Sequence, residues 1–197
     1  MSHIICVTNR ALCEENFLVR LEKIASAHPA AIVLREKDLP PEEYADLAKS
    51  VLKICEKFNV RCILHTFFGV ATDLGAKAIH LPMHVLRSLS NEQRKYFSDL
   101  GASCHSVEEA IEAERLGCTY ITAGHVFDTD CKRGAPGRGL VFLRKVTAAV
   151  SIPVYAIGGM SADNYAEVIA AGAEGACVMS GAMTCPDPEA YFKEFKA

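Results

Sequence analysis

The chain has 197 residues, half of them hydrophobic, and a formal net charge of −3 at neutral pH. This composition is typical of a globular protein with a sizeable core, and it excludes an intrinsically disordered chain. The slight negative charge argues against nucleic acid as the main partner. We expect no leader peptide and no membrane span, because Asn9 and Arg10 interrupt the first apolar run and no later run is long enough, so we expect a cytoplasmic protein.

Nine cysteines are spread along the chain, and no two have the Cys-x-x-Cys spacing of a zinc ribbon or a thioredoxin-type site. Several of them, such as Cys6 and Cys177, fall inside apolar runs, where cysteine packs as a small hydrophobic residue. We therefore expect reduced structural thiols and no disulfide framework. Cys131 is the exception, because the neighbouring Lys132 would lower the pKa of its thiol.

Short apolar runs alternate with helical patterns eight times along the sequence. The runs are residues 4–7, 30–34, 62–64, 76–81, 102–105, 120–123, 152–157 and 176–179. Prolines at 40 and 41 open one helix, and capping-box sequences begin at Ser90 and Ser106. Near-continuous apolar strands that alternate with helices indicate parallel βαβ units. Eight such units predict a closed (β/α)8 TIM barrel that forms one domain over residues 1–197, with an open doubly wound sheet as the alternative.

In a barrel of this kind the functional site lies at the C-terminal ends of the strands. His125 directly follows the sixth apolar run and could act as a general acid or base near neutral pH. A polar, glycine-rich loop with Thr129 and Lys132 comes next, and we expect it to form a mobile lid over the site. After the second run, Arg35 and Lys37 alternate, so they project to the same side and could bind an anion, unless they pair with the neighbouring acidic side chains.

Glycine-rich pairs follow the seventh and eighth runs, Gly158-Gly159 and Ser180-Gly181. Glycine lets backbone N–H groups approach a phosphate closely, so a phosphorylated small molecule is the expected ligand, although such glycines could also serve only tight turns. Three histidines at 65, 84 and 105 could line the same mouth, whereas His80 is expected in the core. The histidines and carboxylates lack metal-site spacing, so we infer neither a metal nor another cofactor.

Five stretches of the chain resemble the thiamine phosphate synthase/TenI superfamily. They are Val33-Leu-Arg-Glu-Lys37, Ser103-Cys-His-Ser106, Gly124-His-Val-Phe-Asp-Thr-Asp-Cys-Lys132, Ile152-Pro-Val-Tyr-Ala-Ile-Gly-Gly-Met160 and Val178-Met-Ser-Gly181. These stretches occur in the order of the family and the resemblance covers nearly the whole chain. It implies a TIM barrel that binds a small phosphorylated thiazole.

Within the superfamily, this sequence resembles TenI more than the synthases. Thiamine phosphate synthases carry an Asn-Asp pair after the third strand and a Gly-Gln-x-Asp run after the fourth, which hold the pyrimidine diphosphate and its Mg²⁺. Here these positions read His65-Thr66 and Pro82-Met-His-Val85. His125 stands where synthases usually have proline. The resemblance therefore implies a thiazole tautomerase.

That reaction would convert the ylidene form of a thiazole carboxylate phosphate to its aromatic form, with His125 moving the proton. The resemblance implies that Arg35 and Lys37 bind the carboxylate, and that Thr129 and Lys132 lie on a loop that closes over the site. The remaining substrate-binding residues would be Gly159, Met179, Ser180 and Gly181.

Two alternatives remain open at the level of sequence. One is a thiamine phosphate synthase, a Mg²⁺-dependent transferase that joins hydroxymethylpyrimidine diphosphate and thiazole phosphate. The other is a non-catalytic regulatory barrel that binds the same kind of ligand. A homo-oligomer is compatible with the sequence.

Overall fold

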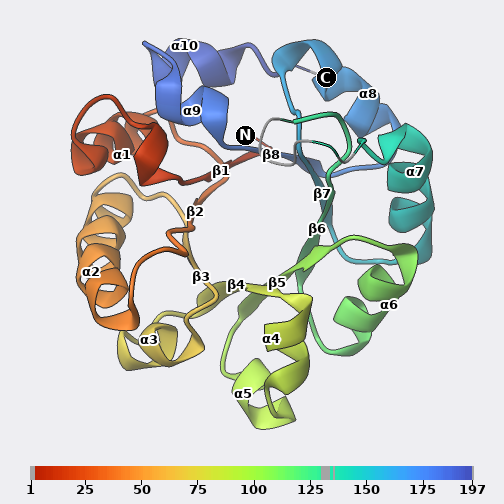
Figure 1. The fold of residues 1–197 in the computed structure, drawn as a ribbon, viewed down its shortest axis with the longest axis horizontal. Coiled ribbons are helices and arrows are strands. Elements are labelled where there is room, and N and C mark those ends of the chain that lie inside the picture. The colour runs from red at the N-terminus through yellow and green to blue at the C-terminus, as the bar shows by residue number, and fades with distance from the viewer. Residues whose placement is uncertain (1–2, 130–133, 135, 197) are drawn as a thin grey trace.

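A computed structural model describes residues 3–129, 134 and 136–196. Within these residues, eight parallel strands pair in sequence order from β1 to β8 and close into a barrel surrounded by helices (Figure 1). The strands are β1 (Ile4–Val7), β2 (Ala31–Leu34), β3 (Cys62–His65), β4 (Ala78–Pro82), β5 (Asp99–Cys104), β6 (Tyr120–Gly124), β7 (Val154–Ile157) and β8 (Gly175–Val178). The prediction of a (β/α)8 TIM barrel is confirmed.

The helices pack against the outer face of the barrel (Figure 1). They are η1 (Arg10–Leu12), α1 (Phe17–Ser26), α2 (Pro41–Lys57), α3 (Phe68–Asp73), α4 (Met83–Ser88), α5 (Asn91–Lys95), α6 (Val107–Arg115), α7 (Gly139–Ala149), α8 (Ala162–Ala170), α9 (Ser180–Thr184) and α10 (Pro188–Lys193). The capping box at Ser90 forms as predicted and begins α5. The short helices α4 and α9 were not expected from the sequence. In the described part of the chain, no helix combines the length and the apolar character that a membrane span requires.

Side-chain alternation along each strand separates two hydrophobic clusters. On β1, Ile4 and Cys6 pack outward against the helices, whereas Ile5 and Val7 pack inside the barrel. On β2, Ile32 and Leu34 belong to the outer cluster and Val33 to the inner one. Continuing this alternation past the end of β2 places Arg35 and Lys37 on the inner side and Glu36 on the outer side.

The lower part of the barrel interior is filled by the side chain of Tyr120 on β6. Gly101 on the neighbouring strand β5 leaves room for this ring, since a Cβ atom there would collide with it. Tyr120 is almost fully buried, and burial raises its pKa well above the usual value of a tyrosine. The Tyr120 ring therefore closes the floor of the upper part of the interior, which opens toward the C-terminal ends of the strands.

Candidate active site

A cavity of about 490 Å³ opens at the C-terminal ends of the strands. This volume suits a small-molecule substrate. Its floor is formed by inward-facing residues of the strands, among them Val7, Val33, Tyr120 and Cys177. Its walls carry polar and charged side chains from the loops that follow the strands.

Two cationic side chains, Arg35 and Lys37, line this cavity beyond the end of β2. We call them the cation pair. The buried His65 lines the same cavity, and its pKa is lowered first by burial and also by the charges of Lys37 and Arg35. The acidic neighbours in sequence turn elsewhere: the carboxylates of Glu36 and Asp38 both bind Arg10.

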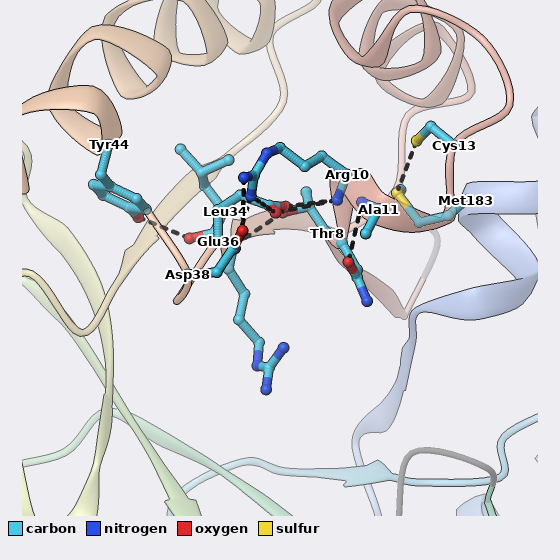
Figure 2. Close-up of polar contacts among 11 residues, drawn as sticks. Thr8, Arg10, Ala11, Cys13, Leu34, Glu36, Asp38, Tyr44 and Met183 are labelled. Atoms are coloured by element: carbon cyan, nitrogen blue, oxygen red, sulfur yellow. Dashed lines mark hydrogen bonds and ion pairs between the residues drawn. The ribbon is translucent and has the colours of Figure 1, made fainter. Parts of the chain in front are cut away.

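The buried carboxylate of Glu36 lies at the centre of a hydrogen-bond network (Figure 2). It accepts hydrogen bonds from the Thr8 hydroxyl at 2.6 Å and from the backbone N–H of Arg10 at 3.1 Å to each oxygen. The Arg10 guanidinium adds a contact of 3.2 Å and continues to both oxygens of Asp38 at 2.7 and 2.6 Å. The bonds to Asp38 and Glu36 raise the pKa of Arg10, and Arg10 in turn lowers the pKa of the Asp38 carboxyl. The network therefore joins the ends of β1 and β2.

Two histidines, His65 on β3 and His80 on β4, stack inside the barrel with ring centroids 5.7 Å apart. His80 bonds the Tyr120 hydroxyl at 3.0 Å through Nδ1 and the Ser103 hydroxyl at 2.8 Å through Nε2. Burial lowers the pKa of His65 to about 2 and that of His80 to about 3. Both rings are therefore neutral at physiological pH and present polar edges to the cavity floor.

Thr66, next to His65, holds φ of 66°, a left-handed conformation that a β-branched residue rarely adopts. Its hydroxyl lies 2.6 Å from His65 Nδ1. The hydroxyl thereby fixes the orientation of the imidazole at the end of β3.

His125 lies at the mouth, just past the end of β6, with 6% of its surface exposed. The chain continues to pair with the end of β7 and the residue after it, since Val126 N donates to Ile157 O at 2.9 Å and Phe127 N donates to Gly158 O at 3.1 Å. Gly158 has φ of 97° and packs directly on the His125 side chain, where a Cβ atom would collide. This close packing holds the imidazole against the wall of the cavity.

The glycine-rich ends of β7 and β8 form another part of the cavity wall. Gly159, with φ of 64°, lines it together with Met179, Ser180 and Gly181. A Cβ atom at Gly159 would collide with the backbone of Asp128 in the loop after β6. The glycine is therefore required by the close approach of the two loops.

Most of the predicted site residues meet at this cavity: Arg35, Lys37, His125, Thr129, Gly159, Met179, Ser180 and Gly181. Lys132 and Cys131 lie outside the described residues. His65, His84 and His105 also line the cavity, and so does His80, which the sequence analysis placed in the core. The cysteines that the structure describes are free thiols, as expected.

Several cavity residues were missed from the sequence. Thr122 faces the interior from β6, two residues before Gly124, and strand alternation could have identified it. Arg87 comes from α4, a helix that the sequence did not indicate, and is bound by Glu112 at 3.0 and 2.6 Å. Glu109 also reaches the cavity wall and accepts a hydrogen bond from the backbone N–H of His105 at 2.6 Å.

The residues at this mouth do not fit the Mg²⁺ ion that the resemblance to synthases implies. Mg²⁺ prefers oxygen ligands, chiefly carboxylates. Of the carboxylates in the described part of the chain, Glu109 is the one that lines the cavity, and it is engaged by His105 N and lies 3.9 Å from Arg87. The described residues also contain no cluster of three or more histidine, cysteine or carboxylate groups able to hold a metal ion.

Comparison with known proteins places this geometry in a family. The sequence profile described as thiamine monophosphate synthase matches residues 4–182. The thiamine-phosphate synthase of Roseiflexus castenholzii is 34% identical over 194 residues, which cover 95% of this chain and 83% of that protein. Thiamine-phosphate synthase 2 of Streptococcus pneumoniae serotype 4 is 31% identical over 195 residues, covering 96% and 91%. The solved thiamine phosphate pyrophosphorylase of Pyrococcus furiosus superposes with a TM-score of 0.83 at 29% identity and covers 98% of this chain and 92% of that one.

These relatives show that the prediction of a thiazole tautomerase was wrong. Two of them are named as thiamine-phosphate synthases, which are transferases, the third is named as a thiamine phosphate pyrophosphorylase, and none of the three is named as an isomerase. The prediction depended on His125 and on the missing carboxylates, but an imidazole at a cavity mouth can hydrogen-bond a substrate in many reactions and does not by itself select proton transfer. With the profile match over residues 4–182 and relatives above 30% identity along almost its whole length, the chain belongs to the thiamine monophosphate synthase family.

Proposed function

We propose that the chain is a thiamine-phosphate synthase, a transferase that joins hydroxymethylpyrimidine diphosphate to thiazole phosphate and releases diphosphate. One observation carries the proposal beyond the names of the relatives. A single cavity of about 490 Å³ has a cation pair on one wall and a glycine-rich wall at the ends of β7 and β8. Two separate anion-binding regions suit a reaction between two phosphorylated substrates.

The cation pair is assigned to the diphosphate of the pyrimidine substrate. Arg35 and Lys37 project from alternate positions of one strand end, so both charges can reach the same group. Arginine binds phosphate oxygens through two parallel N–H groups, and lysine adds a point charge. The phosphate of the thiazole is assigned to Gly159, Ser180 and Gly181, where backbone N–H groups can approach it closely. Thr129 and Met179 line the space near that wall.

The transfer forms a carbon–nitrogen bond to the thiazole and breaks the carbon–oxygen bond to diphosphate. Negative charge therefore grows on the leaving diphosphate, and fixed cations beside it stabilise the transition state more than the ground state. Binding both substrates in one cavity also orients the reacting atoms. His125, packed against Gly158 at the mouth, is proposed to hydrogen-bond the reacting groups where the two substrates meet. Because the described residues do not fit Mg²⁺, no step is assigned to a metal.

The test is to incubate the purified protein with both substrates and to measure thiamine phosphate by chromatography. We expect product only when both substrates are present. His125→Asn should lower kcat by about 10²-fold, the usual contribution of one positioned acid–base or hydrogen-bonding group. No product from the parent protein would refute the synthase, whereas equal rates for parent and variant would refute the role of His125 alone.

A further inference from the structure

We infer that Glu36 is a positioning residue that orients the cation pair toward the anionic substrate, an inference that rests on the proposed function of that pair. Glu36 stands between Arg35 and Lys37 in the sequence, but it faces the outer side of the barrel end and has 2% of its surface exposed. It does not line the cavity, so it would act through its neighbours.

The backbone just before Glu36 is bonded to the end of the neighbouring strand β1. The Thr8 hydroxyl donates to Glu36 Oε1 at 2.6 Å and accepts a hydrogen bond from the backbone N–H of Arg35 at 2.9 Å. Thr8 is fully buried and continues the β1–β2 ladder through its own N–H, which donates to Val33 O at 3.0 Å. The backbone on both sides of Leu34 is thus tied to the end of β1, and the Glu36 side chain bonds the same Thr8 hydroxyl.

The opposite edge of β2 is fixed as well. The hydroxyl of the buried Tyr44 donates to Leu34 O at 2.7 Å and accepts from His65 N at 2.9 Å, which bridges β2 to β3 (Figure 2 shows the contact with Leu34). The segment from Leu34 to Glu36 is therefore held from both neighbouring strands, and Glu36 supplies the anchor on the β1 side.

The side to which the Glu36 carboxylate turns also affects the net charge at the cation pair. A carboxylate between two cations in the sequence would neutralise them if it turned to the same side. The Glu36 carboxylate is instead occupied by three donor groups on Thr8 and Arg10, with all contacts between 2.6 and 3.2 Å. A buried carboxylate bound in this way is held firmly, since losing its partners would leave a charge without solvation. Strand alternation then keeps Arg35 and Lys37 on the inner side.

The experiment uses inorganic diphosphate as the probe and isothermal titration calorimetry as the measurement. Glu36→Gln keeps the shape of the side chain, but the amide NH₂ group would replace one carboxylate oxygen and face the N–H and O–H donors of Arg10 and Thr8. We expect the Kd for diphosphate to rise about tenfold, because displacement of a binding group by a fraction of an ångström can cost that much. A purely electrostatic effect would instead lower the Kd, since removing a negative charge near the site should tighten anion binding.

Asp38→Asn is the matched control. Asp38 binds the same Arg10 guanidinium, and its substitution removes the same charge as Glu36→Gln does. Its side chain, however, is 68% exposed and has no bond to Thr8. Its Kd should stay within about twofold of the parent, since exposed charges are screened. In an Arg35→Gln background, Glu36→Gln should have a much smaller effect, because coupled residues are not additive.

Should Glu36→Gln fail to fold, Thr8→Val and Thr8→Ser test the same network, and only Thr8→Val should weaken diphosphate binding. Equal or tighter binding by Glu36→Gln, or an undiminished effect in the Arg35→Gln background, would overturn the inference. Diphosphate binding requires no turnover, so a protein that depends on Glu36 for binding yet forms no thiamine phosphate would refute only the synthase.

Discussion

Thr8 and Glu36 share a hydrogen bond of 2.6 Å between a buried hydroxyl and a buried carboxylate at the ends of the neighbouring strands β1 and β2. Two residues 28 positions apart in sequence thus fix the strand end that carries the cation pair. We therefore expect the bond to contribute both to the stability of the barrel end and to the position of the residues assigned to the substrate.

Removing the Thr8 hydroxyl should therefore destabilise the fold. Thr8→Val keeps the shape of the side chain but removes one donor to the buried carboxylate and the acceptor of the Arg35 N–H. We expect the free energy of unfolding to fall by about 2–3 kcal/mol, the cost of leaving buried polar groups unsatisfied. Urea denaturation measures it, with Thr8→Ser as the control that retains the hydroxyl. A Thr8→Val protein as stable as Thr8→Ser would contradict the role of this bond.

Replacing Arg35 should weaken substrate binding without unfolding the protein. Its guanidinium lines the cavity and is assigned to the diphosphate. For Arg35→Gln we expect the KM for the pyrimidine diphosphate to rise about tenfold or more, because a hydrogen bond to a charged group contributes about 1.5–3 kcal/mol. Arg144→Gln, at an exposed position of α7, should leave KM unchanged. Similar KM values for the two variants would remove Arg35 from the site.

The buried histidines should make stability fall in acid. Burial lowers the pKa of His65 to about 2 and of His80 to about 3, whereas an unfolded histidine titrates near 6.5. Between these values the unfolded chain binds protons that the folded protein does not. The free energy of unfolding should therefore decrease as pH falls from about 6.5 toward 3, by up to about 1.4 kcal/mol per pH unit for each ring.

This slope can be assigned to a residue with urea denaturation at several pH values. His65→Asn should show a shallower fall in stability below about pH 6.5 than the parent does. His28→Asn, at an exposed position, is the control and should keep the slope of the parent. Identical slopes for His65→Asn and the parent would mean that His65 takes up a proton in the folded state.

The side chains that line the cavity also predict how the rate of thiamine phosphate formation responds to Mg²⁺. The residues that line the cavity offer histidine, arginine and lysine side chains and one engaged carboxylate, Glu109, within the described chain. We expect thiamine phosphate to form at rates within about twofold with added Mg²⁺ or with a chelator, because fixed cations would stabilise the leaving group. A strict requirement for Mg²⁺ would show that ligands beyond these residues complete a metal site.

The barrel could be predicted from the sequence because each strand is a short apolar run and the helices carry caps such as the one at Ser90. The positions of Arg35 and Lys37 followed from strand alternation in the same way. Helix α4 could not be predicted, since it follows Pro82 directly and lacks a side-chain cap, and with it Arg87 was missed.

The network around Glu36 was hidden for a different reason. A carboxylate between two cations looks like their partner in the sequence, and its contact with Thr8 depends on the neighbouring strand, which only the closed barrel brings near. The function was mispredicted because His125 was given one chemical role, whereas its position at the cavity mouth is compatible with several.

The most direct test of the synthase is ³¹P NMR of the purified protein mixed with hydroxymethylpyrimidine diphosphate and thiazole phosphate. The proposed synthase function predicts that diphosphate and thiamine phosphate appear in equal amounts, and that Arg35→Gln slows the growth of both signals together. Unchanged substrate signals, or diphosphate released without thiamine phosphate, would contradict it.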